Sequence, residues 1–297
     1  MDARFKEILK PEVINTVSGL ELIARIIVEG YMSGGNRSRS IGIGQEFSQY
    51  RHYEPGDDLR QLDWKMYARS ERYFIKQAEI ETNIAVKFFI DSSKSMAYQE
   101  EGITKLNFAK VLAAGLAYLA RKQGDTFGLY TINEKEVFQL EPRVEQQQLV
   151  RFLYHLAELK PQASWKKTGL EPLLATHGKE LVVFISDLYD DGDDVMNFIS
   201  RLKTVRNEVI VFHILGKHEL RLDHQGSFAF KDLETGALVK VDTAAQQKIY
   251  QQKIGQWIER IKMSLLEKSV HYHVTLINDP PQEVLRNFLR ARKIFGA

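Results

Sequence analysis

From residue 84 onward, apolar runs of strand length alternate with segments of helix length. Strands are predicted at 84–90, 127–132, 181–185, 209–215 and 271–277. Helices are predicted between and after them, at 105–123, 143–159, 169–176, 192–204, 243–267 and 281–293. This alternation predicts an α/β fold: a doubly wound, mainly parallel sheet flanked by helices.

The composition removes several classes of protein and of site. The 297 residues are 44% hydrophobic, enough to build a sizeable core. The chain contains 41 basic and 39 acidic residues, so its net charge of +2 gives no strong attraction to nucleic acid or anionic membrane. Cysteine is absent, which excludes disulfides, thiolate zinc sites and cysteine nucleophiles.

Membrane insertion and secretion are not expected. The longest clean apolar run, Val111 to Ala120, is half the length of about 20 residues that a membrane span needs. The first residues lack the basic-then-apolar layout of a secretory signal. We therefore expect a cytoplasmic protein with no transmembrane segment.

Two domains are predicted. Residues 1–80 should form a smaller N-terminal module, with a helix from Pro11 to Met32 and strand-like alternation at 72–80. Residues 81–297 should form the sheet domain. Within it, residues of about 218–243 are expected to be an insertion that folds as a β-hairpin around Glu234-Thr235-Gly236.

Oxygen-bearing side chains follow the ends of the predicted strands. Asp91, Ser93 and Ser95 come directly after the strand 84–90, Asp187 follows the strand 181–185, and Thr168 precedes a predicted helix. The carboxyl ends of strands in open α/β sheets meet at one edge, where ligands bind. Carboxylates and hydroxyls suit a hard divalent cation, so we predict a site for Mg²⁺ or Mn²⁺.

Plainer interpretations exist for these residues and their neighbours. Asp-Ser-Ser is also common in turns and at helix N-caps. The acidic residues Asp190 to Asp194 are better explained as the first turn of a helix than as metal ligands. His271 and His273 alternate on one strand, but no third ligand is evident, so ordinary packing is the simpler interpretation.

The five candidate ligands together resemble the metal-ion-dependent adhesion site of von Willebrand factor A domains. The preceding segment resembles the bacterial "domain of unknown function 58" family. Its matching motifs are Gly44-x-Glu46-Phe47, Arg51-x-Tyr53, Pro55-Gly56-Asp57-Asp58-x-Arg60, Asp63-Trp64, Ala68-Arg69 and Glu81.

This resemblance implies a metal-dependent adaptor rather than an enzyme. It would bind an exposed Asp or Glu of a protein partner through Mg²⁺, and would work with a MoxR-type AAA+ ATPase in maturation or assembly of other proteins. Many relatives carry N-terminal membrane helices that this sequence lacks, so a membrane location does not carry over.

The charged and aromatic segment before the sheet allows two interpretations. One is a partly buried ion-pair network that fixes the segment onto the sheet domain; the other is a partner surface. We favour the network, because both charge signs are interspersed. Acidic residues interrupt the basic ones, so no nucleic-acid stripe forms. The predicted network comprises Glu46, Arg51, Tyr53, Asp57, Asp58, Arg60, Asp63, Trp64 and Arg69.

Two other functions are open to the same residues. An Asp after an apolar strand is also how phosphatases of the haloacid dehalogenase type present their nucleophile, which here would be Asp91. That chemistry places a second Asp two residues later as general acid, and Ser93 stands there instead. The second function is that of a structural adaptor whose metal site is vestigial. All five candidate ligand positions hold side chains suited to bind a metal, which argues against this function.

Overall fold

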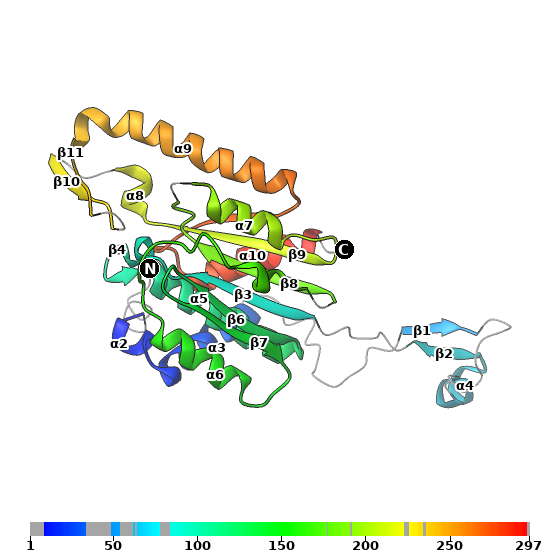
Figure 1. The fold of residues 1–297 in the computed structure, drawn as a ribbon. Helices are drawn as coiled ribbons and strands as arrows, with labels where there is room; N and C mark the ends of the chain where they lie inside the picture. Colours follow the sequence, from blue (N-terminus) through cyan, green and yellow to red (C-terminus); the bar gives the residue numbers. More distant parts are fainter. Residues whose placement is uncertain are drawn as a thin grey trace. The chain divides into compact units, whose positions relative to one another are not determined.

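The computed structural model describes residues 9–33, 49–53, 62, 64–77, 84–176, 178–190, 192–222, 226–233 and 236–295. These residues belong to two compact units (Figure 1). The larger unit combines Met1–Gly35 with Ile84–Ala297, and the smaller is Asn36–Asn83.

A six-stranded sheet organises the larger unit. Its strands are β3 (Ala85–Asp91), β6 (Thr126–Ile132), β7 (Val137–Arg143), β8 (Glu180–Ser186), β9 (Asn207–Leu215) and β12 (His271–Leu276). They lie in the order β12-β9-β8-β3-β6-β7, and every pairing is parallel except that of β6 with β7. The predicted fold class, a mainly parallel sheet flanked by helices, is confirmed.

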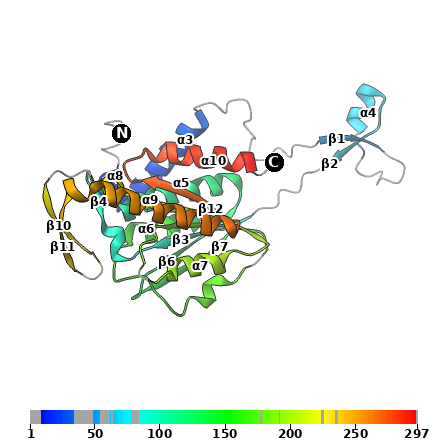
Figure 2. The ribbon, with the colours of Figure 1, turned by 90° about the horizontal axis from the view of Figure 1, so that it is seen from above.

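Helices cover both faces of this sheet (Figures 1 and 2). The short α2 (Pro11–Ile14) leads into the first face, on which α3 (Val17–Ser33), α5 (Lys105–Gln123), α6 (Gln148–Glu158) and α10 (Pro281–Phe295) pack. The second face is covered by α7 (Asp194–Leu202) and α9 (Thr243–Glu267). Side chains of β3 alternate accordingly: Phe88 and Ile90 enter the first core and Phe89 the second.

Local signals explain why α5 begins and ends where predicted. The Thr104 hydroxyl accepts a hydrogen bond from the Asn107 backbone N–H at 3.0 Å, an N-cap that satisfies one free donor of the first turn. Gly124 ends the helix with φ of +80°, which glycine adopts without steric cost. Between these caps the helix is buried along nearly its whole length.

Three predicted elements differ from the structure. The predicted helix 143–159 begins only at residue 148. Residue 143 ends β7, an edge strand whose side chains alternate in exposure, and residues 144–147 connect that strand to α6. The predicted helix 169–176 is a single 3-10 turn, η3 (Glu171–Leu174), and the predicted helix 192–204 is confined to α7. Within the described ranges, no helix combines the length and apolar character that crossing a bilayer requires.

The predicted hairpin is present. It consists of β10 (Ser227–Lys231) and β11 (Leu238–Asp242), which pair antiparallel. It follows the short α8 (Lys217–Arg221) and leads into α9. In Figure 1, the hairpin, α8 and the small strand β4 (Gln99–Glu100), which pairs with β5 (Ile103–Thr104), gather at one end of the sheet.

The predicted domain boundary at residue 80 differs from the structure. Helix α3 belongs to the sheet unit, where it packs on α5 and buries Ile23, Ile27 and Val28 completely or almost so. The two helices approach closely at Gly115, where an added Cβ would lie 3.7 Å from Ile27 Cγ2. The apolar side of the first helix therefore completes a face of the sheet, and the smaller unit is an insertion between α3 and β3.

The described residues of the smaller unit form a β-hairpin and one helix. Strand β1 (Gln49–His52) pairs antiparallel with β2 (Phe74–Gln77), and α4 (Trp64–Ser70) lies between them in sequence. Tyr67 stacks on Tyr73 with ring centroids 4.6 Å apart, and Tyr53 meets Tyr73 edge to face. Trp64, a member of the predicted network, is 63% exposed.

Most of the predicted ion-pair network lies outside the described residues. This holds for Glu46, Asp57, Asp58, Arg60, Asp63 and the side chain of Arg51. Arg69 is exposed. The network therefore stays a prediction.

The packing of α3 can be tested by truncating one buried side chain. We expect Ile27→Ala to lower the free energy of unfolding of the sheet unit by about 2–5 kcal/mol, because it opens a cavity against α5. Leu22→Ala is the matched control, since Leu22 lies on the same helix but is 46% exposed; it should change stability by no more than about 0.5 kcal/mol. Urea unfolding measures both. Equal, small effects would mean that α3 does not belong to this core.

Candidate functional site

The candidate site lies where β3 and β8 end side by side. After β3 the chain crosses to β6 on one side of it, and later returns to β8 on the other side. The loops that follow β3 and β8 therefore leave in different directions, which makes this edge the topological switch point of the sheet. Asp91 is the last residue of β3, and Ser186 is the last residue of β8.

Asp91 fixes the geometry of both loops. Its Oδ1 accepts a hydrogen bond from the Ser93 backbone N–H at 2.9 Å, and its Oδ2 accepts one from the Ser186 hydroxyl at 2.7 Å. The Ser186 hydroxyl also accepts from the Leu188 backbone N–H at 2.8 Å. The carboxylate thus shapes the turn after its own strand and holds it against the end of β8.

A continuous row of oxygen atoms runs from one loop to the other. Ser93 Oγ lies 2.9 Å from Ser95 Oγ, and the Ser95 hydroxyl donates to Asp187 Oδ1 at 3.1 Å. All these side chains are buried. Ser93 precedes the 3-10 turn η2 (Lys94–Ala97), but its side chain makes no capping hydrogen bond. The capping interpretation therefore does not explain the Ser93 hydroxyl.

The structure brings together four of the five predicted ligands. The fifth, Thr168, is exposed and takes no part in the hydrogen bonds that join the other four. The loop that leads to it is nevertheless anchored beside the Asp91 turn. The Lys94 N–H donates to the Ala163 carbonyl at 2.7 Å, and the Gln162 N–H donates to the Ser92 carbonyl at 2.8 Å.

Two carboxylates, Asp91 and Asp187, share this buried edge, and their proximity affects the pKa of Asp91. Burial, reinforced by the negative charge of Asp187, raises the pKa of Asp91 to about 7. The hydrogen bonds from Ser186 and Ser93 oppose this shift, since they stabilise the ionised form. The site is therefore an environment in which added positive charge is favourable.

Lys105 supplies one positive charge, and sequence reasoning did not identify it. Its buried Nζ lies 2.9 Å from Asp187 Oδ2 and 2.8 Å from Glu219 Oε1. Burial alone would lower the pKa of Lys105, but these two carboxylates raise it above its ordinary value. The signal in the sequence was a lysine in the first turn of an apolar helix, where the helix dipole disfavours a cation.

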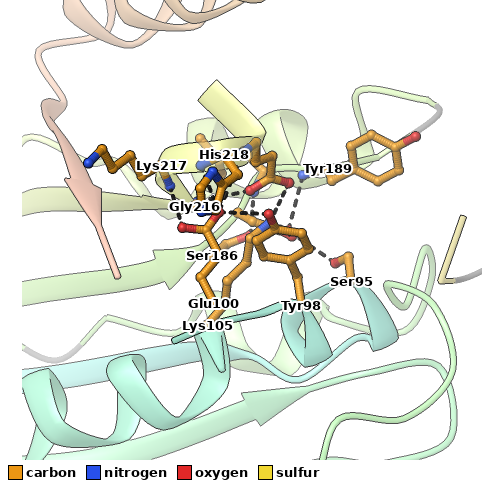
Figure 3. A network of polar contacts seen from close by, with 12 residues as sticks. Ser95, Tyr98, Glu100, Lys105, Ser186, Tyr189, Gly216, Lys217 and His218 are labelled. Atoms are coloured by element: carbon orange, nitrogen blue, oxygen red, sulfur yellow. Dashed lines mark hydrogen bonds and ion pairs between the residues drawn. The ribbon is translucent and has the colours of Figure 1, made fainter. Parts of the chain in front are cut away.

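Glu100 connects the site to α8, as Figure 3 shows. Its carboxylate accepts hydrogen bonds from the backbone N–H groups of Lys217 at 2.9 Å and His218 at 2.8 Å, and from the Tyr98 hydroxyl at 2.7 Å. A Cβ at position 216 would lie 2.2 Å from Glu100 Oε1, so only Gly216 allows this approach. Glu219 of α8 then completes the link through Lys105.

The donor set fits a small hard cation. Adjacent ligands of an octahedral Mg²⁺ with bonds of 2.0–2.1 Å lie about 2.9 Å apart. The Ser93–Ser95 and Ser95–Asp187 oxygen distances, 2.9 and 3.1 Å, are close to that spacing. The described part of the chain contains no group of three or more His, Cys, Asp or Glu placed to hold a metal ion. A metal site here must therefore use the serine hydroxyls.

The remaining candidates have structural roles. The Asp190 carboxylate accepts from the Gly192 and Val195 backbone N–H groups at 3.3 and 3.1 Å, so it caps the start of α7 rather than facing the site. His273 packs against Phe212 and Phe288. Asp91 is a poor candidate for a phosphatase nucleophile, because it is buried and both its oxygens accept hydrogen bonds.

Comparison with solved structures finds chains of low sequence identity. An aerotolerance-related membrane protein from Bacteroides fragilis is 15% identical, covers 70% of this chain and 98% of its own, and has a TM-score of 0.47. The SpRpn10 VWA domain is 13% identical, with coverages of 70% and 95% and a TM-score of 0.41.

Comparison of sequences is more specific. Uncharacterized protein Rv1480 of Mycobacterium tuberculosis and uncharacterized protein Mb1516 of Mycobacterium bovis are each 24% identical over 236 residues, which is 77% of this chain and 73% of theirs. The family described as "Protein of unknown function DUF58" matches residues 49–255. This chain therefore belongs to the DUF58 family.

Proposed function

We propose that the chain is a metal-dependent protein-interaction module. Asp91, Ser93, Ser95 and Asp187 would hold Mg²⁺ or Mn²⁺, and Thr168 would join them when a partner is bound. An exposed Asp or Glu of that partner would complete the coordination. The observation that carries the proposal is the row of buried oxygens from Ser93 to Asp187, spaced like neighbouring ligands of one ion.

The ligand set leaves room for a partner. Two carboxylates and two hydroxyls carry at most two negative charges, and Lys105 already offsets one at Asp187. A divalent ion held there would keep an attraction for a further carboxylate. The metal, when bound, would supply that attraction, and the chain's own groups position the loops. This favours binding over turnover, and so an interaction module over an enzyme.

The partner class follows from family resemblance. Members of this family are typically encoded beside MoxR-type AAA+ ATPases, so we propose such an ATPase as the working partner, in maturation or assembly of other proteins. An exposed acidic side chain on the ATPase or on its substrate would be the group that the site recognises.

Metal binding should appear as thermal stabilisation. With Mn²⁺ or Mg²⁺ at about ten times its dissociation constant, the expected stabilisation is about 1.4 kcal/mol. For a chain of this size that corresponds to a rise in Tm of about 2 °C relative to EDTA. Asp91→Asn should abolish the rise, because it removes the charge and leaves the side-chain shape intact.

Asp194→Asn is the matched control, since Asp194 belongs to the nearby acidic cluster and pairs with Lys167 at 3.4 Å. It should keep the rise in Tm. A rise that survives in Asp91→Asn and disappears in Asp194→Asn would place the ion in the acidic cluster and contradict the proposal.

The role of Lys105 in the metal-free site can be tested separately. Lys105→Met leaves Asp187 buried without its cation, so we expect the free energy of unfolding to fall by about 3–5 kcal/mol. Lys262→Met is the control, because Lys262 pairs with Glu259 at 3.1 Å on the exposed side of α9; its effect should stay within about 0.5 kcal/mol. Denaturant unfolding in EDTA gives both values. Similar small losses would show that the Lys105 pair is not needed to hold the site.

A further inference from the structure

A cavity of about 540 Å³ opens directly beside the candidate metal site. Ser95, Asp187 and Lys105 line it on the side of the sheet. The opposite wall comes from the hairpin and from the first half of α9, through Phe230, Leu233 and Ile249 among others. Its volume lies within the range of about 300–1,000 Å³ found for binding pockets.

The wall of this cavity is apolar and remains open at its rim. Tyr189, Leu233 and Ile249 surround it and are 49%, 40% and 52% exposed. Large apolar side chains gathered around a concave surface mark a binding site more often than a solvated surface. They come from three separate elements: the loop after β8, the hairpin and α9.

The charges in the cavity favour an uncharged occupant. Its acidic groups are Asp187, Glu219 and Asp232, and its lysines are Lys105 and Lys253. Lys105 is buried and paired with Asp187 and Glu219, whereas Lys253 is exposed. Three acidic groups and two lysines leave no excess of positive charge that would hold a second carboxylate in the cavity. An apolar side chain would bury the wall without an electrostatic cost.

We propose that this cavity is a specificity pocket for a large apolar side chain next to the carboxylate that the partner presents to the metal. The inference rests on the proposed function, because the carboxylate positions the segment. Ser95 and Asp187 belong both to the candidate ligands and to the cavity lining. A peptide whose Asp or Glu reaches the metal must therefore lay its neighbouring residue over the pocket. The recognised element is an acidic residue flanked by a Leu, Phe, Tyr or Trp.

The test uses short displayed peptides with Asp fixed at the centre and all other positions randomised. Selection on the full chain in millimolar Mg²⁺, with elution by EDTA, should enrich a large apolar residue at one position beside the Asp. Replacing that residue with Ala in a synthetic peptide should raise the Kd about tenfold or more, since its burial against the wall is lost.

Two matched variants on α9 isolate the pocket. Ile249→Glu places a charge in the lining and should weaken the selected peptide about tenfold. Met263→Glu changes the same helix by the same charge at a residue that is equally exposed, 51%, and lies outside the lining; it should leave the Kd within about twofold. Binding should require Mg²⁺ in all three proteins.

The outcomes separate this inference from the proposed function. Mg²⁺-dependent enrichment of Asp with no apolar neighbour, or with a Kd unchanged by Ile249→Glu, would overturn the pocket and leave the metal site. Selection that does not depend on Mg²⁺, or that returns no Asp peptide, would overturn both. If Ile249→Glu instead converts a dimer to a monomer in sedimentation, the cavity binds a second copy of the chain and the proposal is wrong.

Discussion

The arrangement of this edge of the sheet depends on two buried carboxylates, Asp91 and Asp187, and on the hydrogen bonds and the ion pair that stabilise them. The parallel order of β8, β3 and β6 forces Asp91 and Asp187 to the same end of neighbouring strands. Buried carboxylates are tolerated only when they are hydrogen-bonded or paired. Asp91 is held by Ser93 and Ser186, and Asp187 by Ser95 and Lys105. The four candidate ligands are thus held in position before any ion or partner arrives.

Neutralisation also couples the site to the elements around it. Lys105 bonds Glu219, which places the start of α8, and Glu100 bonds the backbone of the same turn. Tyr250 of α9 donates to the Glu219 carbonyl at 2.6 Å, so α9 is joined to this network. The hairpin connects α8 to α9, so both of its ends are attached to helices of this network. The pocket wall and the candidate metal site therefore share one set of polar contacts.

Sequence patterns predicted the parts of this structure that rest on local information. Runs of consecutive apolar residues predicted β3, β8 and β9. The end of the first run located Asp91, and the end of the second located Asp187. The Lys105–Asp187–Glu219 cluster could not be found that way, because Lys105 is 82 residues from Asp187 and 114 from Glu219, and neither Lys105 nor Glu219 belongs to a motif. The sequence also did not show that α3 belongs to the sheet unit, because an amphipathic pattern does not identify the surface on which the apolar side packs.

Edge strand β7 shows a third limit. Its side chains alternate between half-buried and exposed, so it lacks the continuous apolar run of a central strand. The adjoining residues carry a helical pattern that extended the prediction back to residue 143. Arg143 instead pairs with Phe127 of β6, and such pairing depends on the sheet rather than on the segment alone.

If the proposed function is correct, oxygens from two strand ends bind one cation. The most direct measurement is anomalous diffraction at the manganese edge from crystals of the full chain grown with Mn²⁺ and acetate, the latter standing in for a partner carboxylate. We expect one peak within bonding distance of both Ser93 Oγ and Ser95 Oγ, with acetate on its open side. A peak at the acidic residues before α7, or hydroxyls that still bond each other with no peak between the two loops, would contradict it.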